Sequence, residues 1–176
     1  MKIGWIGVGN MGKPMAKHIQ EYASEFTVCD LNQEAAVDIL ENGGKWAETP
    51  SECAQDKDIL FMSLPMPQDV EKVCTGKDGI IESVKPGTIL LDASTNSLSM
   101  VKKLHKIFDE KGVEFLDCPV SGGVIGAINK DMSIMVGGNE STYKKIKPVL
   151  DAMGDKAIYC GPVGSGTICK LSHQLF

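Results

Sequence analysis

The chain has 176 residues, with 18 lysines and arginines, 23 aspartates and glutamates and a formal net charge of −5. This length predicts one domain, and the 43% of hydrophobic residues is ordinary for a globular protein. The mild acidity argues against binding to nucleic acid, which favours a basic face, and against binding to an anionic membrane surface. No run approaches the ~18 apolar residues of a membrane span.

The six cysteines show no spacing that is typical of a zinc site or a redox motif. The chain enters a strand-like segment at once, without the apolar stretch and cleavage site of a secretory signal. We therefore expect reduced, mostly buried cysteines, a cytoplasmic protein and no bound metal. His18 and His105 lie in predicted helices without ligand partners nearby, so we interpret both as structural or solvated.

Short apolar runs alternate with amphipathic patterns along the whole chain. The predicted strands are Ile3–Val8, Phe26–Asp30, Ile59–Leu64, Thr88–Asp92, Glu114–Cys118, Ser133–Val136 and Ala157–Cys160. The predicted helices are Met11–Ala23, Gln33–Asn42, Gln68–Cys74, Leu98–Lys111 and Ser141–Ala152, and the glycines after two of them suit left-handed caps. This βαβ rhythm predicts an α/β fold of the Rossmann type, doubly wound, with a mostly parallel sheet and helices on both faces.

The first strand and the first helix are joined by Gly7-Val8-Gly9-Asn10-Met11-Gly12, which fits the pattern G-x-G-x-x-G. Gly7 would permit a tight turn, Gly9 would let the backbone approach a pyrophosphate, and Gly12 would let the helix pack closely on the strand. The N-terminus of the helix would offer free N–H groups to the phosphates. We therefore predict that Gly7, Gly9, Asn10, Met11 and Gly12 bind a dinucleotide cofactor.

Asp30 ends the second predicted strand, near the distance of about 20 residues at which such a motif places its acidic residue. A carboxylate there suits a ribose 2′-hydroxyl and repels a 2′-phosphate, and the neighbouring Leu31 offers no positive charge. The sequence thus predicts NAD rather than NADP. The alternative is that Asp30 is an ordinary turn or helix-cap residue, which is common after a strand.

The last segment begins with a glycine-rich loop over residues 161–166 and continues from Thr167 as a helical pattern. Ile168, Leu171 and Leu175 fall on one face, and the pattern reaches Phe176 without a helix-stop signal. We expect a dinucleotide-binding domain over residues 1–163 and the start of an interdomain helix over residues 164–176, in a fragment of a longer protein. The alternative is a short terminal helix that packs back on the domain.

Four more segments follow predicted strands or open the last helix. They are Ser63-Leu64-Pro65-Met66-Pro67, Asp92-Ala93-Ser94-Thr95-Asn96, Asp117-Cys118-Pro119-Val120-Ser121-Gly122-Gly123 and Gly164-Ser165-Gly166-Thr167-Ile168-Cys169-Lys170. With the glycine loop, they closely resemble the β-hydroxyacid dehydrogenase family. That family includes 3-hydroxyisobutyrate dehydrogenase, tartronate semialdehyde reductase and, more distantly, 6-phosphogluconate dehydrogenase.

The resemblance implies an NAD-dependent oxidoreductase that acts on a small 3-hydroxy acid or semialdehyde. It implies that Leu64, Pro65 and Thr95 contact the far end of the cofactor. It also implies that the family's second, all-helical domain, which closes the active site and builds the dimer, is absent from this chain. We therefore expect the full-length protein to be a homo-oligomer, and this chain alone to bind cofactor but to turn over substrate poorly.

The resemblance also implies that Ser121, Gly122 and Gly123 hold the substrate's carboxylate and that Lys170 is the catalytic lysine. Loss of hydride from a carbinol carbon needs a base for the hydroxyl proton, and a lysine can serve where burial lowers its pKa from about 10.4. Gln174 lies one helical turn after Lys170, where it could bind the substrate or orient the lysine. Without the motifs, Lys170 would be interpreted as a solvated lysine and residues 121–123 as a polar turn.

The sequence departs from the family pattern at two places. His173 and Gln174 stand where members usually carry two asparagines, although 6-phosphogluconate dehydrogenases have His followed by Asn. Lys130 stands where the family favours glycine, so either Lys130 adopts a strained positive φ or Asn129 makes the turn.

Two other functions stay open. His173 favours an oxidative decarboxylase of a sugar acid, but this part of the chain lacks a large set of phosphate-binding cations. A non-catalytic nucleotide-sensing or protein-interaction module would need neither Ser121 nor Lys170. The sequence does not select among the candidate substrates, which are 3-hydroxyisobutyrate, glycerate with tartronate semialdehyde, and 4-hydroxybutyrate with succinic semialdehyde.

Overall fold

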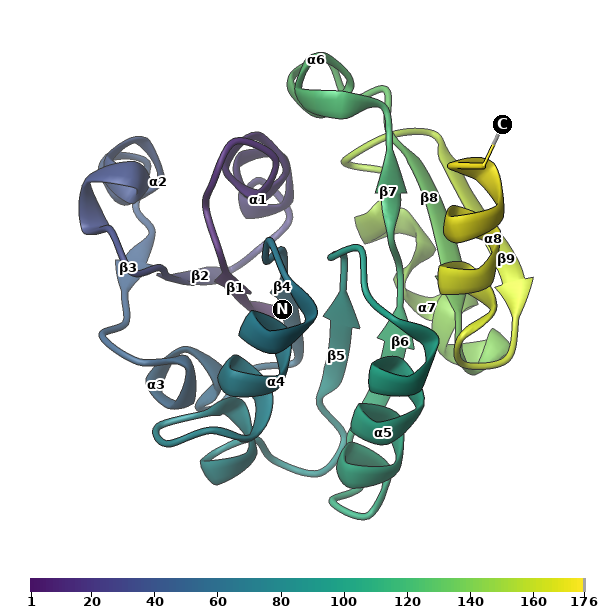
Figure 1. Ribbon diagram of the computed structural model, residues 1–176. Helices are drawn as coiled ribbons and strands as arrows, with labels where there is room; N and C mark the ends of the chain where they lie inside the picture. Colours follow the sequence, from purple (N-terminus) through teal and green to yellow (C-terminus); the bar gives the residue numbers. More distant parts are fainter. Residues whose placement is uncertain (176) are drawn as a thin grey trace.

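The computed structural model describes residues 1–175, and within them it shows a single nine-stranded sheet (Figure 1). The strands are β1 (Lys2–Ile6), β2 (Glu25–Cys29), β3 (Lys45–Trp46), β4 (Ile59–Met62), β5 (Ile89–Asp92), β6 (Glu114–Asp117), β7 (Val120–Ser121), β8 (Ser133–Gly137) and β9 (Lys156–Gly161). Their order is β3-β2-β1-β4-β5-β6-β8-β7, and β9 pairs with β8. The order β3-β2-β1-β4-β5-β6 is that of a doubly wound dinucleotide-binding sheet.

The sheet is mostly parallel, as predicted. Strands β1 to β6 all pair in parallel, and β8 also pairs in parallel with β9. The exceptions are the antiparallel pairs that β8 makes with β6 and β7. The chain therefore matches the predicted α/β Rossmann-type fold and adds an antiparallel turn-back near its C-terminal end.

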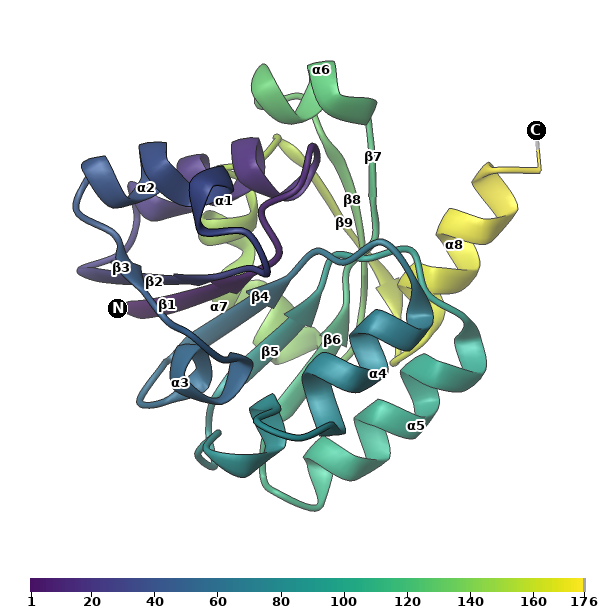
Figure 2. The same ribbon diagram turned by 60° about the vertical axis from the view of Figure 1, so that its left-hand side comes forward.

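Helices cover both faces of the sheet. Residues of α1, α2 and α7 bury their apolar side chains in one core, and those of α3, α4 and α5 bury theirs in the other (Figure 2). The helices are α1 (Gly12–Gln20), α2 (Val37–Glu41), α3 (Pro50–Ala54), α4 (Pro67–Thr75), α5 (Leu98–Asp109), α6 (Gly123–Ile128), α7 (Glu140–Leu150) and α8 (Ser165–His173), with 3₁₀ turns at Gln33–Ala36 and Ile80–Glu82. Among residues 1–175, no helix combines the length and the apolar character that crossing a membrane requires.

The central strands send alternate side chains into the two cores, because successive residues of a strand point to opposite faces. In β1, Ile3 and Trp5 lie in the core under α1 and α7, whereas Ile6 lies in the other core. In β4, Phe61 stacks on Trp5 with ring centroids 5.1 Å apart, while its neighbour Leu60 faces the opposite core. Both faces of the central strands are therefore covered by helices.

The predicted strands and helices are present, with ends that differ by up to three residues. The predicted helix Gln33–Asn42 begins as a 3₁₀ turn and becomes α-helical only at Val37, and the short elements β3, β7, α3 and α6 were not predicted. Gly43 and Gly112 have φ values of 87° and 70°, which confirms the left-handed caps. Phe176, which ends the predicted segment 164–176, lies outside the described residues.

Candidate functional site

The carboxyl ends of the parallel strands meet at one edge of the sheet, where the arrows of β5 and β6 end in Figure 1. The residues predicted to bind the cofactor lie on the loops after β1, β2, β4 and β5 and at the first residue of α1. The strand order reverses direction between β1 and β4, and open α/β sheets bind ligands at such a switch point. The candidate site is therefore built on the loops at this edge.

The glycine loop turns tightly after β1 and leaves its middle open. Gly7 has a φ of +94°, and a Cβ at this position would collide with the carbonyl oxygen of Ser63. A Cβ at Gly12 would collide with the carbonyl oxygen of Gly7, so α1 starts in direct contact with the turn. A Cβ at Gly9 would meet no atom within 4 Å. Gly9 is thus the position at which a ligand can approach the backbone.

The N-terminus of α1 has no side-chain cap. Met11 is the N-cap residue and makes no side-chain hydrogen bond to the first turn, and the neighbouring Asn10 is exposed. The first N–H groups of a helix have no partner inside the helix, and together they favour an anion. The loop therefore offers donors for a phosphate beside the open backbone of Gly9.

Asp30 is bound to the glycine loop. Its Oδ2 accepts a hydrogen bond from the backbone N–H of Val8 over 2.7 Å, and its Oδ1 accepts one from the N–H of Asn32 over 2.9 Å. The second bond makes Asp30 a turn residue, which was the alternative interpretation, and the first bond holds its carboxylate beside the loop. Leu31 is fully exposed, with no basic side chain in the adjacent position.

The loops after β4 and β5 are joined by one hydrogen bond, in which the backbone N–H of Leu64 donates to Ser94 Oγ over 2.9 Å. Leu64 is half-buried and contacts the glycine loop, since a Cβ at Gly7 would lie 3.0 Å from its Cδ2. Pro65 and Thr95 are exposed on the two loops. The structure thus brings Leu64 beside the glycine loop and links it to the loop of Thr95.

Asp92 organises the loop after β5 and was not predicted to be a site residue. It is 1% exposed, and its carboxylate accepts hydrogen bonds from the N–H of Ser94 and from Nδ2 of Asn96, each over 3.0 Å. Burial raises the pKa of the Asp92 carboxyl above its ordinary value, and the carboxylate of Asp117 adds to that rise. Because Ser94 holds Leu64, Asp92 supports both loops.

The predicted substrate loop lies between β7 and α6. Ser121 is half-buried at the end of β7, opposite Ser133 of β8. Gly122 is the N-cap of α6 with a φ of +142°, and Gly123 has a φ of +64°. Both glycines are exposed and adopt backbone conformations that L side chains rarely adopt. The local geometry therefore favours glycine at both positions, whatever the loop binds.

The end of α6 decides between the two possibilities for the turn at Lys130. Lys130 has a φ of +59°, and Asn129 has a φ of −87°, so Lys130 takes the left-handed position. His18 of α1 lies in hydrogen-bond contact with the carbonyl oxygens of Ala127 and Ile128, at 2.9 and 3.2 Å. His18 thus has the structural role that was predicted, tying α6 to α1.

Lys170 lies on the side of α8 that packs against the sheet. It is 8% exposed, whereas Gln174, the C-cap residue of α8, is exposed. The two residues therefore differ in burial, although the N–H of Gln174 donates to the carbonyl oxygen of Lys170 over 3.1 Å and places Gln174 one helical turn further on. The predicted apolar stripe lies outside, with Ile168, Leu171 and Leu175 at 50%, 40% and 84% exposure.

A second buried aspartate holds the start of α8. Asp117 ends β6, is 1% exposed and accepts hydrogen bonds from the N–H groups of Gly164 and Thr167, each over 2.7 Å. The sequence assigned it no role, because its partners lie 47 and 50 residues away.

The six cysteines are free, and four of them are buried. Within residues 1–175, no cluster of histidine, cysteine or carboxylate side chains is arranged to hold a metal ion.

Comparison with known proteins agrees with this geometry. A family model described as the NAD binding domain of 6-phosphogluconate dehydrogenase matches residues 2–161. The chain belongs to the β-hydroxyacid dehydrogenase family. An uncharacterized oxidoreductase of Bacillus subtilis, YkwC, is 39% identical over 173 residues, which cover 98% of this chain and 60% of that protein. The mitochondrial 3-hydroxyisobutyrate dehydrogenase of Mus musculus is 35% identical over 98% of this chain and 52% of its own length.

Two solved structures of similar proteins have the same fold. The Mycobacterium tuberculosis 3-hydroxyisobutyrate dehydrogenase, solved with L-serine, superimposes with a TM-score of 0.91 and 31% identity over 99% of this chain and 59% of that one. Psf3, in complex with NADP+ and 2-OPP, superimposes with a TM-score of 0.91 and 27% identity over 98% and 61% of the two chains. This chain spans 52–60% of the length of the curated relatives cited above.

Proposed function

We propose that this chain binds NAD(H) and forms the cofactor-binding part of an enzyme that interconverts a small 3-hydroxy acid and its semialdehyde. The observation that carries the proposal is the open backbone at Gly9, set between the turn at Gly7 and the uncapped start of α1. Relatives named 3-hydroxyisobutyrate dehydrogenase and 2-(hydroxymethyl)glutarate dehydrogenase support the substrate class. Residues 1–163 would be the cofactor domain and residues 164–176 the start of a connecting helix.

The residues at the carboxyl edge fit a dinucleotide. The N–H groups around Gly9, Asn10, Met11 and Gly12 would hold the pyrophosphate, and Asp30 would accept a hydrogen bond from the adenosine ribose. Leu64 and Pro65, with Thr95 on the next loop, would contact the far end. Two observations support NAD over NADP: the carboxylate of Asp30 beside the loop and the exposed Leu31 next to it.

Lys170 would exchange a proton with the substrate oxygen. The bound cofactor supplies the acceptor or donor of hydride. In the oxidation direction, Lys170 in its neutral form takes the hydroxyl proton, and in the reduction direction its ammonium gives that proton back. The buried position of Lys170 on α8 supports this role, because burial can lower the pKa of a lysine. Ser121 and the N–H groups of Gly122 and Gly123 would hold the carboxylate, with Gln174 as a further contact.

A second function is favoured by one specific observation. His173 is that observation, because it resembles the histidine that 6-phosphogluconate dehydrogenases carry there before an asparagine, and the family model that matches residues 2–161 is described as the NAD binding domain of that enzyme. An oxidative decarboxylase of a sugar acid would bind the same cofactor but release CO2. Fluorescence titration of this chain with NADH and NADPH tests the cofactor. The reaction is tested with a panel of hydroxy acids and sugar acids and the full-length protein, by measuring NADH formation and CO2 release. Cofactor binding without turnover of any acid would indicate a non-catalytic module.

The setting of the full-length protein is also a proposal. The free cysteines support a reducing compartment, and we place the protein in the cytoplasm on that ground. The exposed apolar residues of α8 support an association with a further helical region and a homo-oligomer. The net charge of −5 supports a small-molecule partner rather than nucleic acid or an anionic membrane. Size measurement of the full-length protein tests the oligomer.

A further inference from the structure

The start of α8 has an unusual cap, because the acceptor comes from a distant strand. Gly164 is the N-cap residue, with a φ of +92° and no side chain to accept a hydrogen bond. Asp117, at the end of β6, takes that place. Its Oδ1 accepts the N–H of Gly164 over 2.7 Å, and its Oδ2 accepts the N–H of Thr167 over 2.7 Å and the hydroxyl of Thr167 over 2.9 Å.

The same contact is reinforced by the backbone. A Cβ at Gly137 of β8 would collide with Asp117 Oδ1 and would lie 2.8 Å from the N–H nitrogen of Gly166. A Cβ at Gly166 would collide with the carbonyl oxygen of Met135 and would lie 2.8 Å from the carbonyl oxygen of Asp117. The first turn of α8 thus lies directly against the backbones of β6 and β8.

This anchored turn leads straight to Lys170. Thr167 and Lys170 are three residues apart, so they share one face of the helix, and both are buried. At a rise of about 1.5 Å per residue, Lys170 stands only ~4.5 Å along the helix axis from the residue that Asp117 holds. A change at Asp117 therefore acts on the lysine through a single turn of helix.

We propose that Asp117 is a positioning residue: its carboxylate fixes the first turn of α8 on the sheet and so sets the place and direction of the Lys170 side chain. The proposal rests on the role proposed above for Lys170. Three donors converge on Asp117, and a carboxylate has acceptor sites for all of them. An asparagine has the same shape but one acceptor oxygen, so at least one N–H of the turn would face its NH₂ group.

The test uses two variants that weaken the contact with Asp117 to different degrees, one conservative variant that keeps it, and one matched control. Asp117→Asn keeps the shape and removes acceptors. Thr167→Val removes only the hydroxyl, so it keeps the test usable if Asp117→Asn fails to fold, and Thr167→Ser restores that hydroxyl. Asp109→Asn removes the same charge from an exposed position at the end of α5. Amide hydrogen exchange of this chain reports the anchoring of α8, and steady-state kinetics of the full-length enzyme report its consequence.

We expect the amides of the first turn of α8 to exchange at least about fivefold faster in Asp117→Asn, as for the loss of a helix cap. A misplaced catalytic group costs about 10²-fold in rate, so we expect kcat to fall by that order. The pH profile of kcat should shift, while KM and NADH affinity stay near wild type. Thr167→Val should show a smaller loss in the same direction, Thr167→Ser should recover most of it, and Asp109→Asn should match wild type.

Two results would overturn the proposal. One is wild-type hydrogen exchange in α8 of Asp117→Asn. The other is faster exchange with an unchanged kcat and pH profile, in an enzyme that Lys170→Ala inactivates. Failure of the proposed function would look different from both results. Lys170→Ala would then turn over substrate like wild type, while hydrogen exchange in α8 would still respond to Asp117→Asn. That outcome would remove the catalytic consequence and leave only the anchoring of the helix.

Discussion

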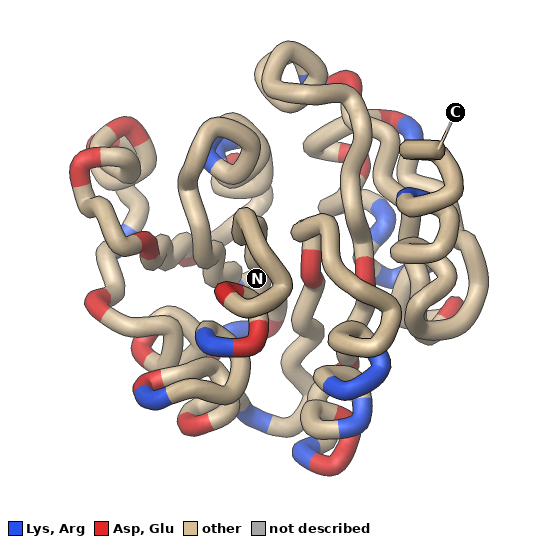
Figure 3. The backbone as a smooth tube through the Cα atoms, in the orientation of Figure 1, with Lys and Arg blue, Asp and Glu red and all other residues tan. Residues whose placement is uncertain are grey.

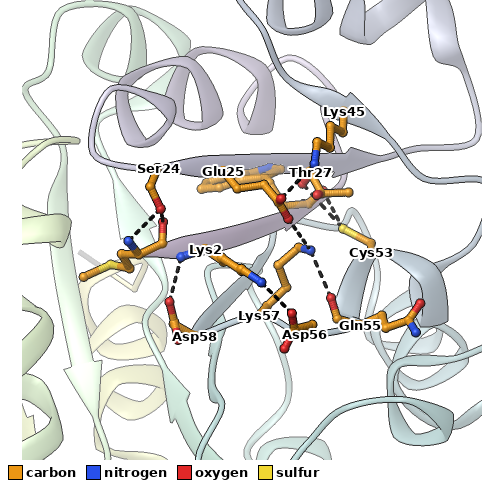
Figure 4. A network of polar contacts seen from close by, with 12 residues as sticks. Lys2, Ser24, Glu25, Thr27, Lys45, Cys53, Gln55, Asp56, Lys57 and Asp58 are labelled. Atoms are coloured by element: carbon orange, nitrogen blue, oxygen red, sulfur yellow. Dashed lines mark hydrogen bonds and ion pairs between the residues drawn. The ribbon is translucent and has the colours of Figure 1, made fainter.

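The two edges of the sheet use their charged residues in different ways. At the amino edge, charged side chains pair with one another in the network of Figure 4. Lys2 pairs with Asp56 at 2.5 Å, and Glu25 pairs with Lys45 at 2.7 Å and with Lys57 at 3.4 Å. These pairs satisfy their charges locally and lie mostly at the surface, so this edge has little left to offer a ligand.

At the carboxyl edge, buried carboxylates accept hydrogen bonds from backbone N–H groups instead. Figure 3 colours the acidic residues red and the basic residues blue along the backbone. Asp92 and Asp117 end β5 and β6 and lie opposite one another in the parallel pairing of these strands. Both are 1% exposed, and both accept hydrogen bonds from backbone N–H groups. Because charge-assisted bonds to the backbone are strong in a buried setting, each aspartate fixes one loop or helix start.

This difference teaches where a substitution should matter. The carboxyl edge depends on a few buried or tightly packed groups, each of which sets the place of a segment that bears candidate site residues. The amino edge distributes its charge over exposed pairs, any one of which contributes little. Substitutions at the carboxyl edge should therefore change function strongly, and those at the amino edge should change only stability, and weakly.

The largest effect should come from Lys170. In the full-length enzyme, Lys170→Ala should lower kcat by roughly 10²–10⁴, the usual range for loss of a general acid–base. NADH affinity should be unchanged, because the glycine loop follows β1, whereas α8 follows β9 in another part of the sheet. Steady-state kinetics with a responsive hydroxy acid and a parallel NADH titration measure both quantities. Near-normal turnover would remove Lys170 from the mechanism.

The next largest effect should separate two glycines of the same loop. Gly12→Ala places a methyl group against the carbonyl oxygen of Gly7. Such overpacking typically costs about 1–3 kcal/mol of folding free energy, and we expect a loss in that range. It should therefore lower Tm and abolish tight NADH binding. Gly9→Ala meets no protein atom within 4 Å, so it should keep the Tm of wild type and weaken NADH alone. A Tm loss in Gly9→Ala would mean that this position is structural and not a point of ligand approach.

Local signals explain what could be predicted from the sequence. The glycine loop and Asp30 lie within one strand–helix–strand unit, so their spacing alone indicated their arrangement. The helix α3 had such a signal too, because Thr49 caps the N–H of Glu52 over 3.1 Å and Pro50 opens the helix, but the segment is only five residues long. No local signal in the sequence indicated the role of Asp117, because a hydrogen bond across 47 residues depends on how β6 and α8 pack.

A moderate effect is expected for cofactor preference. Wild type should bind NADH more tightly than NADPH, because a carboxylate facing a 2′-phosphate is a like-charge contact. Asp30→Asn removes the charge and should narrow that ratio by about tenfold, or ~1.4 kcal/mol. Fluorescence titration with both reduced cofactors measures it, and Glu34→Gln, an exposed carboxylate in the nearby 3₁₀ turn, is the matched control. Equal binding of the two cofactors by wild type would show that Asp30 does not face the ribose.

The smallest effect should come from the amino edge and should appear only through pH. Hydrogen bonds from Lys2 and then Lys85 lower the pKa of Asp56 from 3.8 to about 2. A carboxyl whose pKa is lower in the folded protein stabilises it above the unfolded value and loses that contribution as pH falls through the folded value. Asp56→Asn should therefore lower Tm slightly above about pH 4 and match wild type only below about pH 2, with cofactor affinity unchanged throughout. Asp109→Asn, whose carboxylate has no ion-pair partner among residues 1–175, should not lower Tm at neutral pH, and a matching loss there would show that net charge rather than the Lys2 pair is responsible.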